Sequence, residues 1–193
     1  MKVFLIDGHS LLFRAHYTFI KNPLKTSKGQ DTGALFGFFN MLKPLLKRET
    51  PEIVAFAFDR GRETFRRKKY EKYKAQRKEC PEEIKEQTPL AKQIISAMGY
   101  SVLELQDYEA DDIIGTLSQA FSKEGHEVTI VTGDRDALQL VSESVSVLLT
   151  KRGIRETSLY TPEKIEKEYS LNPWQLVEVK GLQGDSSDNI PGV

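Results

Sequence analysis

The chain has 193 residues, of which 28 are basic and 28 are acidic, so its formal net charge is zero. This length suits one well-cored domain, and the ordinary hydrophobic content indicates a soluble globular protein with no apolar run long enough to span a membrane. The single cysteine excludes a disulfide framework, and the N-terminus lacks the pattern of a signal peptide, so we expect an intracellular protein.

The first half of the chain predicts two buried strands and two helices. Residues 3–7 and 53–59 are apolar until each run ends in an aspartate, which is typical of strands that are covered on both faces. Between these strands, apolar residues recur at helical spacing over residues 11–17, with Ser10 as the expected N-cap, and over residues 33–47.

A strongly basic segment follows at residues 60–78. It contains ten Lys or Arg and two Glu, so it carries a charge of +8 and the rest of the chain carries −8. Its spacing predicts a helix, one face of which carries Arg66, Tyr70, Lys74 and Arg77. Lysine and arginine bind phosphates, and tyrosine stacks on unpaired bases. We therefore expect a nucleic-acid clamp that is poorly ordered until its ligand binds and neutralises it.

The second half of the chain alternates helices with short strands. Strands separated by helices imply an α/β fold with a mostly parallel central sheet and helices on both faces. The expected elements are, in order, a helix that starts at Pro81 and is ended by Gly99, a strand at 102–105, a helix opened by Glu109, strands at 128–131 and 145–149, and helix starts at Thr161-Pro162 and Asn172-Pro173.

Acidic residues gather where the predicted strands end. Asp7, Asp59 and Asp134 follow three separate strand patterns, and ligands bind at the carboxyl ends of the strands in such sheets. Any one acidic cluster would be interpreted as solvated surface, but all of them together at one edge would repel strongly unless cations were bound. The nine carboxylates are those of Asp7, Asp59, Glu109, Asp111, Asp112, Asp134, Asp136, Asp185 and Asp188.

The donor set favours hard divalent ions. Carboxylate oxygens are the ligands that Mg²⁺ and Mn²⁺ prefer, and two such ions about 3.5–4 Å apart would suit hydrolysis of a phosphodiester bond. The three histidines are scattered and only one cysteine is present, so a structural zinc site is not expected. His9 follows Asp7 closely, and we expect it to make a local hydrogen bond.

A set of motifs occurs in an order that resembles one family. The motifs are LIDG at 5–8, FRA at 13–15, FD at 58–59, TFR at 64–66, YKAQR at 73–77, YEADD at 108–112, TGDRD at 132–136 and GDSSDNIPGV at 184–193. From Val3 to Val193 the chain resembles the 5′–3′ exonuclease domain of bacterial DNA polymerase I, within the flap endonuclease superfamily. The resemblance implies a PIN-like or resolvase-like 5′ nuclease fold, with a basic helical arch over residues 60–80.

The resemblance also implies residue roles. One Mg²⁺ or Mn²⁺ ion would be surrounded by Asp7, Asp59, Glu109 and Asp111, and the other by Asp112, Asp134, Asp136, Asp185 and Asp188. Lys74 and Arg77 would be catalytic, since the family places them on the arch in contact with the scissile phosphate. The residues expected to bind DNA are Arg14, Arg66, Tyr70, Tyr73, Lys74 and Arg77.

The family cuts 5′ flaps and removes RNA primers in DNA replication and repair, leaving a 5′ phosphate and a 3′ hydroxyl. The implied partners are DNA with a 5′ single-stranded flap or nick and RNA–DNA primers, bound by a monomer in the bacterial cytoplasm at the nucleoid. Family members continue past Val193 into a helix-turn-helix element that grips duplex DNA. We therefore expect a single catalytic domain over 1–193 that is incomplete at its C-terminus, with 181–193 as the start of that element, and a polymerase region can follow.

Three other functions are alternatives to this one. A haloacid-type phosphatase would need a second aspartate where the chain has His9. A PIN-type ribonuclease has a smaller acidic set, and the cluster at 185–188 and the basic segment argue against it. A non-catalytic module, whose metals only position a flap, is not excluded by the sequence.

Overall fold

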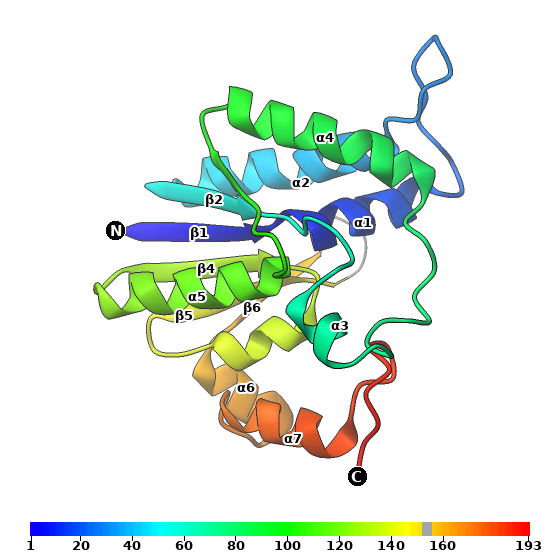
Figure 1. The fold of residues 1–193 in the computed structure, drawn as a ribbon. Coiled ribbons are helices and arrows are strands. Elements are labelled where there is room, and N and C mark those ends of the chain that lie inside the picture. The colour runs from blue at the N-terminus through cyan, green and yellow to red at the C-terminus, as the bar shows by residue number, and fades with distance from the viewer. Residues whose placement is uncertain (152–155) are drawn as a thin grey trace.

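The computed structural model describes residues 1–151 and 156–193, which form a six-stranded sheet in the order β3-β2-β1-β4-β5-β6 (Figure 1). Strands β1 to β5 are parallel, and β6 is antiparallel to β5 at one edge. The prediction of a mostly parallel sheet is therefore confirmed. The strands are β1 (Lys2–Asp7), β2 (Ile53–Ala57), β3 (Ser101–Leu103), β4 (Glu127–Thr132), β5 (Val145–Thr150) and β6 (Thr157–Tyr160).

Helices cover both faces of the sheet, as Figure 1 shows. One face is covered by α1 (Gly8–Phe19), α2 (Gly33–Glu49) and α4 (Glu82–Ala97), and the other by α5 (Ala110–Lys123), the 3₁₀ helix η1 (Arg135–Leu140) and α6 (Pro162–Tyr169). The remaining helices are α3 (Phe65–Lys69), in the basic segment, and α7 (Gln175–Gln183), which packs beside η1. None of the described helices is long and apolar enough to cross a membrane.

Strand β1 divides the core into two layers because its side chains alternate between the faces. Phe4 and Ile6 pack with α1, α2 and α4, whereas Val3 and Leu5 pack with α5 on the opposite face. All four are at most 1% exposed, and full burial of each such side chain contributes about 1.5–3 kcal/mol to folding. The two layers fix the sheet between helices, so the strand ends form a rigid platform.

Several predicted boundaries need correction. Ser10 is not the N-cap of α1; Asp7 is, because its side chain accepts the Ser10 N–H and the helix starts directly after the strand. The 53–59 strand ends at Ala57. Thr161 does precede α6, but α7 starts at Gln175 rather than at Pro173. Strand β6 and helix η1 were not predicted, since both are too short for a periodic signal.

A glycine at the start of α1 allows this helix to pack tightly under the sheet edge. A β-carbon at Gly8 would lie 2.3 Å from Cζ of Phe58, which is fully buried and directly precedes Asp59. We expect Gly8→Ala to lower the free energy of unfolding by about 1–3 kcal/mol, because the core cannot accept the added methyl group without moving the ring.

Urea denaturation measures this effect, and a glycine in α5 supplies the control. A β-carbon at Gly115 would lie 3.6 Å from Leu140, which is an ordinary contact, so Gly115→Ala should stabilise the helix by about 0.5–1 kcal/mol. Equal midpoints for the Gly8→Ala variant and the wild type would show that Phe58 moves freely.

Candidate active site

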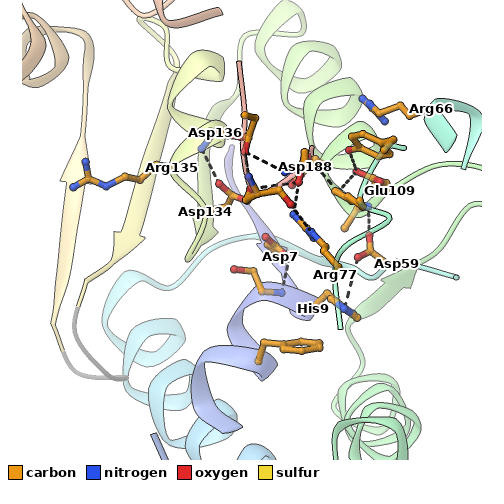
Figure 2. Close-up of a pocket in the computed structure, with 18 of the residues that line it drawn as sticks. Asp7, His9, Asp59, Arg66, Arg77, Glu109, Asp134, Arg135, Asp136 and Asp188 are labelled. Carbon is orange, nitrogen blue, oxygen red and sulfur yellow. Dashed lines mark hydrogen bonds and ion pairs between the residues drawn. The ribbon is translucent and has the colours of Figure 1, made fainter. Parts of the chain in front are cut away.

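Three aspartates lie where the parallel strands β1, β2 and β4 end (Figure 2). Asp7 ends β1, is 4% exposed, and accepts the Ser10 N–H at 2.9 Å. Asp59 lies just past β2, and its Oδ1 accepts the Ala110 N–H at 2.7 Å, which joins it to the start of α5. Asp134 lies just past β4 as the N-cap of η1. The backbone therefore directs all three carboxylates to the same sheet edge.

The first turn of α5 brings further carboxylates to this edge. Glu109 is the N-cap residue, and Asp111 lies in the first turn. Burial, followed by the negative charges of Asp7, Asp134 and Asp59, raises the pKa of Asp111 to about 8. Burial likewise raises the pKa of Asp7 to about 6. The site is therefore strained by like charges and favours a cation.

One cleft of about 680 Å³ contains most of the predicted acids. The prediction that they converge at the carboxyl ends of the strands is confirmed for eight of the nine. The eight are Asp7, Asp59, Glu109, Asp111, Asp134, Asp136, Asp185 and Asp188.

Asp112 is the exception, and the prediction that it lies with the others is wrong. Its two carboxylate oxygens accept hydrogen bonds from Arg66, both at 2.7 Å, and one also accepts the Glu109 N–H at 3.0 Å. Burial alone would raise the pKa of Asp112, but these hydrogen bonds and the charge of Arg66 outweigh it and lower the pKa. Asp112 therefore caps α5 and anchors the basic segment.

The C-terminal turn contributes the last two acids. Asp185 Oδ1 accepts hydrogen bonds from the backbone N–H and the hydroxyl of Ser187, at 2.8 and 2.7 Å, which folds the turn on itself. The side-chain hydrogen bond from Ser187 is the main reason that the pKa of Asp185 falls well below its usual range. Asp188 is directed toward the basic segment, where Figure 2 shows Arg77 beside it.

Lysine and arginine side chains pair with four of the eight acids of the cleft. Lys74 Nζ lies 2.7 Å from Glu109 Oε2 and 3.8 Å from Asp188 Oδ2, and Arg77 also pairs with Asp188. Lys180 of α7, which the sequence reasoning missed, lies 2.9 Å from both Asp136 and Asp185. Three basic groups thus hold positions among the carboxylates.

These basic groups bear on whether the site fits a metal. Among residues 1–151 and 156–193, no three His, Cys, Asp or Glu side chains are arranged to hold a metal ion as they are placed. Ammonium and guanidinium groups lie against four of the cleft acids, and a cation bound by those acids would have to displace them. The four are Glu109, Asp136, Asp185 and Asp188. The donor atoms are carboxylate oxygens, so the chemistry of the set fits a hard divalent ion.

The basic segment is less helical than predicted. Only Phe65–Lys69 forms a helix, and Lys74 has a φ of 54°, a left-handed conformation that an α-helix cannot contain. Its tip contacts the C-terminal turn: the Lys74 N–H donates to Asp188 O at 3.0 Å, and Asn189 Nδ2 donates to Lys72 O at 2.9 Å. The expectation that only a ligand neutralises this segment is wrong in part, because Lys74 and Arg77 already pair with acids of the cleft.

The other predicted DNA-binding residues have different surroundings. Tyr73 is buried, and its hydroxyl donates to Glu109 at 3.1 Å, while burial raises its pKa. Tyr70 is 37% exposed and lies outside the cleft. The Arg14 guanidinium donates to the carbonyls of Gly133 and Lys151, so it braces the loop that carries Asp134. Contact with DNA stays a prediction for all of them.

A second cleft of about 470 Å³ adjoins the first and shares Lys74, Arg77, Asp59 and His9 with it. Helix α1 contributes a row of rings, with centroids 4.8 Å apart for His9 and Phe13 and 6.3 Å apart for Phe13 and Tyr17. The cations that line this cleft are Arg60, Arg62, Arg67, Lys74, Arg77 and Lys78. Rings and cations together suit a single strand of nucleic acid.

His9 itself does not make the local hydrogen bond that we expected. Its Nε2 lies 3.7 Å from Asp59 Oδ2, which is beyond hydrogen-bond range, and its Nδ1 is buried without a partner among the described residues. Burial lowers the pKa of His9. The ring therefore packs as a neutral aromatic group at the junction of the two clefts.

Comparison with known proteins gives a consistent result. A family model described as "5′-3′ exonuclease, N-terminal resolvase-like domain" matches residues 2–170. DNA polymerase I of Bacillus caldotenax is 45% identical over 192 residues, which is 100% of this chain and 22% of the polymerase. The chain thus spans about a fifth of the length of the curated relatives it matches.

Two solved structures share the fold. The bacteriophage T5 protein co-crystallised with metal ions has a TM-score of 0.75 at 20% identity, covering 100% of this chain and 70% of that chain. The T5 flap endonuclease in a pseudo-enzyme-product complex with DNA and metal ions has a TM-score of 0.74, with the same identity and coverage. These likenesses establish a common arrangement of sheet and helices.

Proposed function

This chain belongs to the family of 5′-3′ exonuclease N-terminal resolvase-like domains, and from this premise we propose that it hydrolyses phosphodiester bonds of DNA near a free 5′ end. The observation that carries the proposal is one cleft in which eight carboxylates lie beside the basic segment. Acids alone would repel a phosphate, and bases alone would only bind it. Their combination in one cleft suits metal-dependent phosphodiester hydrolysis.

Two divalent cations, Mg²⁺ or Mn²⁺, are the proposed cofactors. The first would be held by Asp7, Asp59, Glu109 and Asp111, and the second by Asp134, Asp136, Asp185 and Asp188. When bound, such ions would lower the pKa of the attacking water and stabilise the leaving 3′ oxygen. Asp112 is left out of both groups because Arg66 occupies its two oxygens.

Lys74 and Arg77 are the proposed catalytic residues of the chain itself. Both lie at the rim between the two clefts, and their present partners are carboxylates that a metal would engage. Once released, their charges would hold the scissile phosphate and offset the negative charge that develops in the transition state. Tyr73, fixed by Glu109, would orient Lys74 beside it.

The second cleft is the proposed path of the 5′ single strand. The bases of this strand would stack on the rings of Phe13 and Tyr17, and its phosphates would follow the cations of the basic segment. The strand would thereby enter the acidic cleft at His9, which lines both. This arrangement favours unpaired DNA, because a duplex does not present bases for stacking.

We further propose that the chain is the nuclease part of a longer DNA polymerase I, given the curated relatives of which it spans about a fifth. Its substrates would be 5′ flaps, nicks and RNA–DNA primers, cut to leave a 5′ phosphate and a 3′ hydroxyl during replication and repair. Such a protein would act as a monomer at the nucleoid, in the bacterial cytoplasm.

The test is cleavage of a 5′-labelled flap in Mg²⁺, with EDTA as the control, resolved on a denaturing gel beside an RNA-primed substrate. We expect short labelled products in Mg²⁺ only. Retention of the flap in a mobility-shift assay without any cleavage would instead identify a non-catalytic binding module. Cleavage of RNA alone would favour a ribonuclease.

A further inference from the structure

A buried threonine links the two carboxylate groups of the cleft. Thr132 is the last residue of β4 and is 1% exposed. Its Oγ1 donates to Asp7 Oδ2 at 2.7 Å and accepts the Asp134 N–H at 3.0 Å. One hydroxyl group thus touches a carboxylate of the first proposed group and the backbone of the second.

The neighbouring contacts make this link stiff. Strands β1 and β4 are adjacent and parallel, with Ile6 opposite Val131, so Asp7 and Thr132 leave the sheet side by side. The Gly133 N–H donates to Ser10 Oγ at 3.1 Å, and a β-carbon on Gly133 would lie only 2.8 Å from that oxygen. The turn after β4 is therefore pressed against α1, with little room to shift.

The Thr132 hydroxyl also limits the directions from which the Asp7 carboxylate can bind a cation. Asp7 Oδ1 is held by the Ser10 N–H and Oδ2 by Thr132, so both oxygens are oriented while each retains acceptor capacity for a cation. On the other side, the Asp134 carboxylate accepts the Asp136 N–H at 2.8 Å, so fixing the backbone of Asp134 fixes both acids. Valine at this position would keep the shape of threonine and lose both hydrogen bonds.

From these contacts we infer that Thr132 is a positioning residue, whose hydroxyl sets Asp7 and the Asp134–Asp136 pair in the relation that binding of divalent metal requires. The inference rests on the proposed function, because it assigns to these acids the role of metal ligands. Hydrogen bonds that orient metal ligands commonly change metal affinity by about 10–100-fold when removed.

The experiment is Mn²⁺ binding to the purified chain, followed by isothermal titration calorimetry and by the electron paramagnetic resonance signal of free Mn²⁺. We expect Thr132→Val to raise the dissociation constant by about 10–100-fold. Thr132→Ser keeps the hydroxyl and should stay within about threefold of the wild type, since the ligand geometry is retained. Should the valine variant not fold, Thr132→Ala removes the same hydroxyl without its branched bulk.

The matched control is Thr150→Val. Thr150 is also 1% exposed at the end of a strand, but its hydroxyl donates to the Thr132 carbonyl at 3.3 Å and to no carboxylate among the residues that the structure describes. The Thr150→Val variant should bind Mn²⁺ with the same affinity as the wild type. Equal Mn²⁺ affinity of the Thr132→Val variant and the wild type would overturn this inference and leave the proposed function standing. An equal loss of Mn²⁺ affinity in Thr132→Ser and Thr132→Val would do the same. No Mn²⁺ binding by the wild type would overturn the proposed function and this inference with it.

Discussion

Replacement of Asp111 with asparagine should abolish most of the cleavage of a 5′ flap in Mg²⁺. The side chain lies among Asp7, Asp59 and Asp134, and all three raise its pKa. Asparagine keeps the shape but removes the charge that a divalent ion needs. Loss of several kcal/mol of metal-assisted stabilisation corresponds to a rate decrease on the order of 10³-fold or more.

The same substitution should leave the protein at least as stable when EDTA is present. A buried carboxylate surrounded by others destabilises the fold in the absence of a cation, so its removal relieves repulsion. Thermal unfolding in EDTA and single-turnover cleavage in Mg²⁺ together measure the two effects. Reduced activity that arose from unfolding would show as a lower melting temperature.

Asp112 supplies the control for Asp111, because it lies next to it in the same turn of α5. Its oxygens bind Arg66 rather than facing the cleft, so Asp112→Asn should bind Mn²⁺ with the affinity of the wild type. If both variants lost metal binding to the same extent, Asp112 would be a ligand after all, as the family resemblance implied.

Replacement of Lys74 with alanine should lower turnover by on the order of 10²–10³-fold, with a much smaller change in substrate affinity. Its ammonium lies between Glu109 and Asp188, one acid from each proposed metal group, and so is central to the cleft. A charge at that point stabilises the transition state more than the ground state.

Single-turnover kinetics and equilibrium binding on one flap substrate separate these effects. Lys72 is the control, because it is exposed on the same segment and contacts the C-terminal turn through its carbonyl oxygen. Lys72→Ala should weaken binding slightly and leave turnover unchanged. A Lys74→Ala variant that lost affinity but kept its turnover would be a phosphate anchor only.

Much of the acidic site was predictable because parallel strands bring their carboxyl ends together. Asp7, Asp59 and Asp134 each follow an apolar run, and that pattern alone placed them at one edge. The pairing of Asp112 with Arg66 was not predictable, since it joins two segments 46 residues apart in the chain. Residue spacing gives no sign of which acid in a helix turn faces the cleft and which faces a cation.

The basic segment was misread for a related physical reason. Helical spacing of its charges suggested a continuous helix, but its conformation is set by contacts with residues more than 100 positions away. Lys180 was missed because its partner Asp136 lies in another element. Thr132 did have a signal, a hydroxyl side chain at the end of a buried strand, although its two partners depend on the fold.

The ion pairs of Lys74, Arg77 and Lys180 with the cleft acids have a thermodynamic consequence. Each basic group that binds a carboxylate is withheld from phosphate, and each cation that takes its place releases it. Metal and DNA should therefore each increase the affinity of the protein for the other. The factor by which Mg²⁺ raises the affinity for DNA must equal the factor by which DNA raises the affinity for Mg²⁺. In the metal-free protein these basic side chains are bound to carboxylates, and they become available to DNA phosphates as the metal sites fill.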